Sequence, residues 1–430
     1  MTFRGKVSVL ALSGVIAVYA VVGGMLSPWT RAQQPINDST AQLRIFESVL
    51  QHIQNDYVDD PNMEKVRLGA LRGLAAGLDP YSSYLTADQV REFNATKSSN
   101  KVGIGAEFSQ VSYLYVVSVT KGSNAEKAGL RAGDAVEYIE NQATRYMSLF
   151  EARNLINGAP GTVVNLRVLR VGEKPLVIKV ARGAAKAPAA EGRIEAPKTG
   201  VVKVYGLDNG EASNIRNQVQ NLVKQGADKI VLDLRGVATG SLEEGVAVAN
   251  LFIRNGELAK VVGKDSAVRK TFTAEPAKGI FDGKLAVLID LGTAGAAEAV
   301  AAAVLDRKRG EVVGERSFGA GTDQQLFTLR AGDGLLLTTA KWASPSGVPF
   351  LGEERTSTGI KPSVEVKRPE TPDPIEVDEL IDQQDNQTQN PQPTPTPAAK
   401  PKADAKPAED IQLKKAIEIL QDKAQAAKVG

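Results

Sequence analysis

The chain has 430 residues, 42% of them hydrophobic, so it is long enough for two or three domains with separate cores. Its 52 basic and 50 acidic residues leave a formal charge of +2, which gives no electrostatic reason to expect a nucleic-acid partner. Cysteine is absent, which excludes disulfides, thiolate nucleophiles and cysteine-based zinc sites, and we expect no metal or other cofactor. The single histidine, His52, lies in a polar stretch and is expected to be an ordinary surface residue, not part of a catalytic triad.

The N-terminal segment predicts export. Arg4 and Lys6 precede an uncharged apolar run at 7–26, which is long enough to cross a bilayer as a helix. The positive-inside rule then places the rest of the chain outside the cytoplasm. A weak cleavage site ends at Ala32, so residues 1–32 are either a signal peptide or a signal anchor, and the length of the run favours an anchor in the inner membrane. We expect the protein in the cell envelope, on the periplasmic side.

The patterning of the remaining chain predicts five further parts. Residues 36–98 predict a small helical prodomain, with apolar residues at helical spacing over 43–57 and a second helix at 64–78 that Asp79-Pro80 ends. Residues 99–185 predict a β-rich module with short β-branched runs, at 113–119, 135–139, 163–169 and 176–180. Residues 186–368 predict an α/β core in which strands alternate with helices, the strands at 201–204, 229–234 and 285–289 and the helices at 211–224, 242–253 and 296–307.

The C-terminal part divides in two. Residues 369–409 are rich in proline, glutamine and threonine without apolar periodicity, which predicts a disordered linker. Residues 410–430 predict an amphipathic helix, which must dock on another surface to be stable.

Within the β-rich module, the run Gly103-Ile104-Gly105-Ala106 precedes a second stretch, Ala125 to Asp134, and the two together resemble a PDZ domain. In such domains a glycine-rich loop directs backbone amides at the terminal carboxylate of a peptide, which adds a strand to the sheet edge. The resemblance implies that Gly103, Ile104, Gly105 and Ala106 bind the peptide. Asn124 stands where proline is usual, and a plain turn between β-runs is the simpler alternative.

Further motifs occur in the order found in one enzyme family, namely 78–85 (LDPYSSYL), 233–235 (DLR), 313–319 (VGERSFG), 344–347 (SPSG) and 359–362 (GIKP). Over nearly its whole length the chain therefore resembles the carboxy-terminal processing, or tail-specific, serine proteases. The resemblance implies a ClpP/crotonase-like α/β core with flanking helices, joined to the PDZ domain, the helical prodomain and the C-terminal helix. It also implies a serine nucleophile at the start of a helix, with a lysine as its base.

Both positions of this dyad carry other residues. The resemblance places Gly295 at the nucleophile and Ala320 at the base, and neither side chain can attack a carbonyl or accept a proton. Gln324 matches a glutamine that holds the lysine in the family, and Gly240 and the amide of Ala296 match an oxyanion hole. The loop at 236–239 has lost the asparagines and proline that are usual there. No catalytic residue of the family mechanism is therefore intact.

Three functions stay open on these grounds. The leading hypothesis is a pseudoprotease that binds C-terminal peptides of exported proteins, or modulates an active relative or a second copy of itself by pairing with it. The rival is an active endopeptidase with a displaced nucleophile, for which Thr293 and Ser317 are the candidates. The S-x-x-K sequence at 98–101 is expected to be a solvated loop. The third is an architectural envelope protein whose PDZ groove is idle.

Overall fold

The computed structural model describes residues 39–95, 100–110, 112–171, 173–354, 357–368 and 409–421. The expected signal segment at 1–32 and nearly all of the expected linker at 369–409 lie outside these residues. No helix in the described ranges is both long and apolar enough to cross a membrane. The chain divides into two compact units, Met1–Ala70 and Leu71–Gly430, which we describe separately.

The first unit contains helix α2 (Ser39–Asp56) and the beginning of α3 (Met63–Ala76). The predicted helix over 43–57 is thus confirmed. Its large apolar side chains are exposed, including Leu43 at 67% and Phe46 at 41%. His52 is a surface residue on this helix, and its Nδ1 lies 2.6 Å from Asp56 Oδ2, one turn further along.

The second unit begins within α3 and continues into a short strand that the sequence did not predict. Strand β1 (Ser83–Leu85) precedes α4 (Ala87–Ala95), and it pairs antiparallel with β16 (Gly334–Ala343). The prodomain predicted as helical at 36–98 therefore also contains a strand, at these three residues. Tyr84 and Leu85 are almost fully buried, and this burial depends on a strand about 250 residues away that local sequence cannot indicate.

The PDZ part is a sheet in the order β2-β3-β4-β6-β7, with β5 paired to β4. Its core is formed by inward residues such as Val116, Val136 and Leu166. Strand β2 forms one edge of this sheet, and an edge strand can pair with a further strand. The elements are β2 (Ala106–Gln110), β3 (Leu114–Val119), α5 (Asn124–Lys127), β4 (Ala135–Ile139), β5 (Gln142–Ala143), α6 (Leu149–Ile156), β6 (Val163–Leu169) and β7 (Leu176–Ala181).

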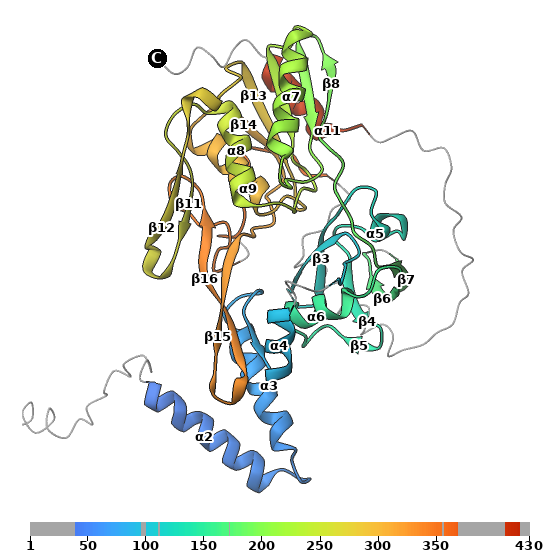
Figure 1. Ribbon diagram of the computed structural model, residues 1–430, viewed down its shortest axis with the longest axis vertical. Coiled ribbons are helices and arrows are strands. Elements are labelled where there is room, and N and C mark those ends of the chain that lie inside the picture. The colour runs from blue at the N-terminus through green and yellow to red at the C-terminus, as the bar shows by residue number, and fades with distance from the viewer. Residues whose placement is uncertain are drawn as a thin grey trace, which may run out of the picture. The chain divides into compact units, whose positions relative to one another are not determined.

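The α/β core is a sheet in the order β17-β14-β13-β10-β9-β8, in which only the β8–β9 pair is antiparallel among the described strands. Helices α7, α8 and α9 connect its parallel strands and pack on one face (Figure 1). The predicted helices agree with the observed ones to within one residue. The elements are β8 (Glu191–Ala196), β9 (Thr199–Lys203), α7 (Glu211–Lys224), β10 (Lys229–Asp233), α8 (Leu242–Phe252), β13 (Lys284–Ile289), α9 (Ala296–Asp306), β14 (Glu311–Gly314) and β17 (Val364–Glu365).

The C-terminal helix α11 (Ile411–Gln421) covers the other face of this sheet. Strand residues alternate between faces, so Ile230 and Leu232 pack toward α7–α9 whereas Val231 packs against α11. Leu413 and Leu420 of α11 are buried there. This packing supplies the docking surface that the amphipathic pattern requires.

A third sheet joins β1, β16, β11 and β12 in that order, and β15 pairs with β16. It was not predicted. Its strand pairs carry register shifts, for example between Asp323 and Gln324, and they join segments that lie far apart in the sequence. Its importance for the site is Trp342 of β16, described below. The remaining elements are β11 (Glu257–Val262), η2 (Lys264–Ser266), β12 (Val268–Thr273), η3 (Pro276–Lys278), β15 (Thr322–Thr328) and η4 (Arg330–Gly332).

Candidate functional site

The turn between β13 and α9 carries Gly295 at the helix N-cap. Its backbone has φ 57° and ψ −111°, a region that favours glycine. Hydrolases place a nucleophile on such a sharp strand-to-helix turn, which exposes the side chain. A Cβ added to Gly295 would meet Trp342 Cζ3 at 3.5 Å, an ordinary contact. The turn therefore retains both the backbone form and the space of a nucleophile position, although it has no side chain there.

The second turn follows β14 and contains Gly319 and Ala320. Gly319 has φ +88°, and a Cβ there would lie 2.1 Å from Thr358 Cγ2, so only glycine fits. Ala320 is partly buried and packs against an apolar cluster that includes Phe318. The side chain at the expected base position thus contributes packing and no proton acceptor.

Glu298 on α9 holds the two turns together. The amides of Gly295 and Ala320 both donate to its Oε2, each at 2.8 Å, so the two nitrogens lie within twice that distance of each other. The amide of Gly319 donates to Oε1 at 2.8 Å, and the hydroxyl of Ser317 donates to the same oxygen. The structure therefore brings the two expected dyad positions together around one buried carboxyl group.

Burial raises the pKa of Glu298 to about 7, and the hydrogen bonds from Ser317, Ala320, Gly295 and Gly319 oppose that rise. Sequence reasoning missed this residue. The signal was present, because a glutamate three residues after an N-cap position is the spacing of a capping box.

The two candidate displaced nucleophiles are fully buried. Thr293 Oγ1 donates to Leu234 O at 3.0 Å and accepts from the amide of Asp290 at 3.0 Å. Ser317 Oγ donates to Glu298 and accepts from the amide of Ile360 at 2.6 Å. Both residues are 0% exposed. Their hydroxyls therefore serve the packing of the turns, and a peptide carbonyl has no access to them in this structure.

The remaining expected site residues, Gly240, Ala296 and Gln324, lie in different surroundings. Gly240 has φ +123°, and a Cβ there would lie 2.1 Å from Leu207 O, which fixes glycine at the end of the 236–240 loop. Ala296 is buried in the first turn of α9. Gln324 is exposed on β15, and its amide donates to the hydroxyls of Thr322 and Thr338 at 2.6 and 3.4 Å. These contacts of Gln324 belong to the β15–β16 hairpin and do not reach Ala320.

The PDZ sheet packs directly against the two turns. The rings of Tyr115 and Phe318 stack with their centroids 5.9 Å apart and their planes at 17°. Tyr113 and Val117 extend this apolar cluster to Ala294 and Ala320. Neither the sequence spacing nor the hydrophobic pattern indicated that β3 would contact these turns, because the contact joins segments about 200 residues apart.

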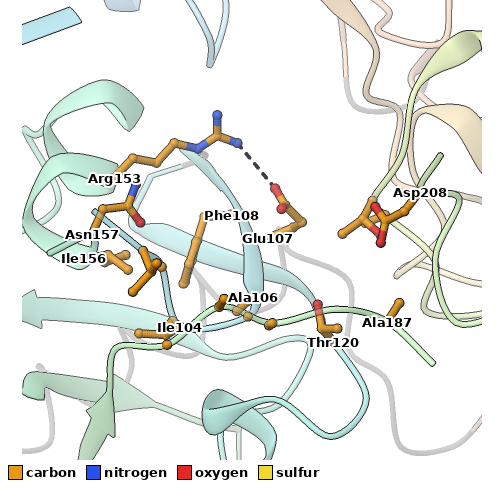
Figure 2. Close-up of a pocket in the computed structure, with 18 of the residues that line it drawn as sticks. Ile104, Ala106, Glu107, Phe108, Thr120, Arg153, Ile156, Asn157, Ala187 and Asp208 are labelled. Atoms are coloured by element: carbon orange, nitrogen blue, oxygen red, sulfur yellow. Dashed lines mark hydrogen bonds and ion pairs between the residues drawn. The ribbon is translucent and has the colours of Figure 1, made fainter. Parts of the chain in front are cut away.

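A cavity of about 680 Å³ lies where the PDZ domain meets the core (Figure 2). The four predicted peptide-binding residues, Gly103 to Ala106, line it together with residues of α6 and of the 238–240 loop. Gly105 has φ +83°, and a Cβ there would lie 2.3 Å from Ser123 Cβ. This loop is closely fixed, because any side chain at Gly105 would displace it.

The loop also offers hydrogen-bond donors. The carbonyls of Gly103, Ile104 and Gly105 accept from the amides of Gly183, Ala125 and Thr120 at 2.9, 3.0 and 2.9 Å. For their own amides we find no backbone partner among the described residues. Such a row of backbone N–H groups is suited to bind an anion such as a terminal carboxylate. As far as the described residues go, no cluster of acidic and histidine side chains could hold a metal.

The fold agrees with comparisons to known proteins. The model of peptidase family S41 matches residues 198–366, and a PDZ domain model matches residues 115–170. The chain is 31% identical to a protein of Staphylococcus aureus named probable CtpA-like serine protease, over 85% of this chain and 71% of that one. It is 29% identical to the carboxy-terminal processing protease CtpA of Bacillus subtilis, over 84% of this chain and 78% of that one.

Among solved structures, the photosystem II D1 C-terminal processing protease superposes with a TM-score of 0.60 at 25% identity. The match covers 76% of this chain and 94% of that one. It supports the description as a protease-type α/β core with a PDZ domain. The chain belongs to the carboxy-terminal processing serine proteases of peptidase family S41.

Proposed function

We propose that this member of the family binds the C-terminal tails of exported proteins in its PDZ groove and does not cleave them. The observation that carries the proposal is the pair of turns around Glu298, which places Gly295 and Ala320 side by side in a retained frame without a nucleophile or a base. The buried hydroxyls of Thr293 and Ser317 support it further, since each is already engaged in hydrogen bonds.

The PDZ groove, which is the cavity lined by Gly103 to Ala106, is the part of the molecule that would bind the tail. Backbone amides at Gly103, Ile104 and Gly105 face a terminal carboxylate, and the edge of β2 pairs with the extended tail. The uncharged run at 7–26 supports a place in the cell envelope, with the binding parts on the periplasmic side. A tail held without hydrolysis is either protected there or presented to an active relative.

Binding of tail peptides to the full-length protein tests this function. Fluorescein-labelled peptides with an apolar C-terminal residue are titrated with the protein, and each peptide is compared with its C-terminally amidated form. We expect saturable binding of the free acid and at least about tenfold weaker binding of the amide, because the amide carries no charge for the backbone donors. Equal binding of both forms would contradict carboxylate recognition.

Two matched glycine variants locate the binding site. Gly105→Ala and Gly161→Ala both place alanine at nearly the same φ, +83° and +82°, but only the first puts a Cβ against neighbouring atoms. We expect Gly105→Ala to lose tail binding and Gly161→Ala to keep it. Loss in both variants, or in neither, would place the tail elsewhere.

A further inference from the structure

Three charged side chains line the cavity where the PDZ domain meets the core. Glu107 lies on β2, Arg153 on α6, and Asp208 between β9 and α7. Figure 2 shows the carboxylate of Glu107 between Arg153 on one side and Asp208 on the other. The PDZ domain and the core therefore each contribute one carboxylate to the same cavity.

The positive charge of Arg153 does not neutralise the negative charges of both Glu107 and Asp208. Arg153 Nη2 lies 3.5 Å from Glu107 Oε2, and the side chains are 49% and 40% exposed, so the contact is loose and exposed to solvent. Asp208 forms no ion pair with any described residue. The cavity therefore carries an excess of negative charge.

A hydroxyl in the same wall is also unpartnered. Thr239 Oγ1 is buried and has no hydrogen-bond partner among the described residues, although Thr239 lines the cavity. Buried polar groups are normally hydrogen-bonded, so this hydroxyl is a polar atom in the cavity wall that the fold leaves unpaired.

We propose that the groove selects tails with a lysine or arginine close to the C-terminus, whose cationic group lies between Glu107 and Asp208. The proposal rests on the proposed tail-binding function and adds the class of tail. Glu107 is the second residue of β2, directly after the carboxylate-binding loop. Since a strand rises about 3.3 Å per residue, the basic residue falls within about three residues of the tail's end.

Arg153 affects how strongly acidic tails bind compared with basic tails. A tail aspartate or glutamate could pair with Arg153, but it would also lie beside the carboxylates of Glu107 and Asp208. Repulsion between these like charges weakens the binding of an acidic tail. Removal of Arg153 leaves only negative charge in the cavity. Arg153→Gln should therefore increase the preference for a basic tail.

A charge scan of the tail tests the inference. Peptides of one length with the same apolar C-terminal residue carry lysine, alanine or glutamate at each of the three preceding positions, and fluorescence anisotropy measures their binding to the full-length protein. At one position or more we expect lysine tails to bind about tenfold more tightly than glutamate tails, with a smaller ratio at high salt.

Variants assign the preference to the two carboxylates. Glu107→Gln combined with Asp208→Asn should abolish the ratio between lysine and glutamate tails while binding of the alanine tail persists. The control Glu173→Gln changes a carboxylate of the PDZ domain outside the cavity and should keep the ratio. A ratio that survives in the double variant, or is absent in the unaltered protein, overturns the inference but leaves the proposed function in place. Failure of every tail to bind overturns both.

Discussion

Replacement of Glu298 by glutamine should remove a defined part of the pH dependence of stability. Glu298 is 0% exposed and accepts three backbone amides and one hydroxyl from the two turns of the site. Burial raises the pKa of this carboxyl group from an ordinary value near 4.5 to about 7 in the folded protein. The folded state therefore binds this proton more tightly than the unfolded state.

The sign and size of the effect follow from linkage. Below about pH 4.5 Glu298 is protonated in both the folded and the unfolded state. Its contribution to the free energy of unfolding is therefore fully present in this range. As the pH rises toward and through 7, the unfolded state ionises first, and this stability is lost. At about 1.4 kcal/mol per pKa unit, the loss for Glu298 amounts to about 3 kcal/mol by pH 8 to 9.

Urea unfolding of the unaltered protein and of Glu298→Gln, measured at intervals from pH 4.5 to 9, tests this. Glutamine does not titrate, so the free energy of unfolding of the unaltered protein should fall relative to the variant by about 3 kcal/mol over that range. Glu418→Gln, on the half-exposed side of α11, serves as the control and should follow the unaltered protein. A constant difference between Glu298→Gln and the unaltered protein at all pH values would refute the reasoning.

Three further substitutions have expected outcomes. Leu420→Ala should lower the free energy of unfolding by about 2–5 kcal/mol, because this leucine of α11 is 3% exposed and packs against the sheet. A change below about 1 kcal/mol in urea unfolding would argue against the docking of α11 on the sheet. Phe318→Ala should lower the free energy of unfolding by about 3–5 kcal/mol, because the ring is 5% exposed and its removal leaves a cavity as well as losing the stack on Tyr115. Unchanged urea unfolding would contradict that packing. The double variant Gly295→Ser with Ala320→Lys should cleave tail peptides slowly, and a serine-reactive probe should label it at position 295. Labelling at any other residue would show that the dyad assignment is wrong.

Much of the architecture could be predicted from local sequence. The helix at Glu211–Lys224 and the strand at Val163–Leu169 agree with prediction at both ends, since each is bounded by glycine or polar residues and has a clear apolar period. The placement of Gly295 and Ala320 followed from motif order, and the structure does bring these two turns together.

What the sequence could not show depends on contacts between distant segments. Strand β1 forms only because Ser83–Leu85 finds β16, and Trp342 reaches Gly295 only through that same strand. The cavity gains Asp208 only because the core meets the PDZ domain there. Periodicity and turn chemistry describe one segment at a time, so they cannot indicate which carboxylates or aromatic rings will share a surface.

The most direct test of the central claim is prolonged incubation of the full-length protein with a free-acid tail peptide, followed by mass spectrometry. The account predicts that the peptide binds and remains intact, because Gly295 and Ala320 supply neither nucleophile nor base and the hydroxyls of Thr293 and Ser317 are buried. Cleavage products that disappear with Thr293→Ala or Ser317→Ala would contradict it and identify an active peptidase.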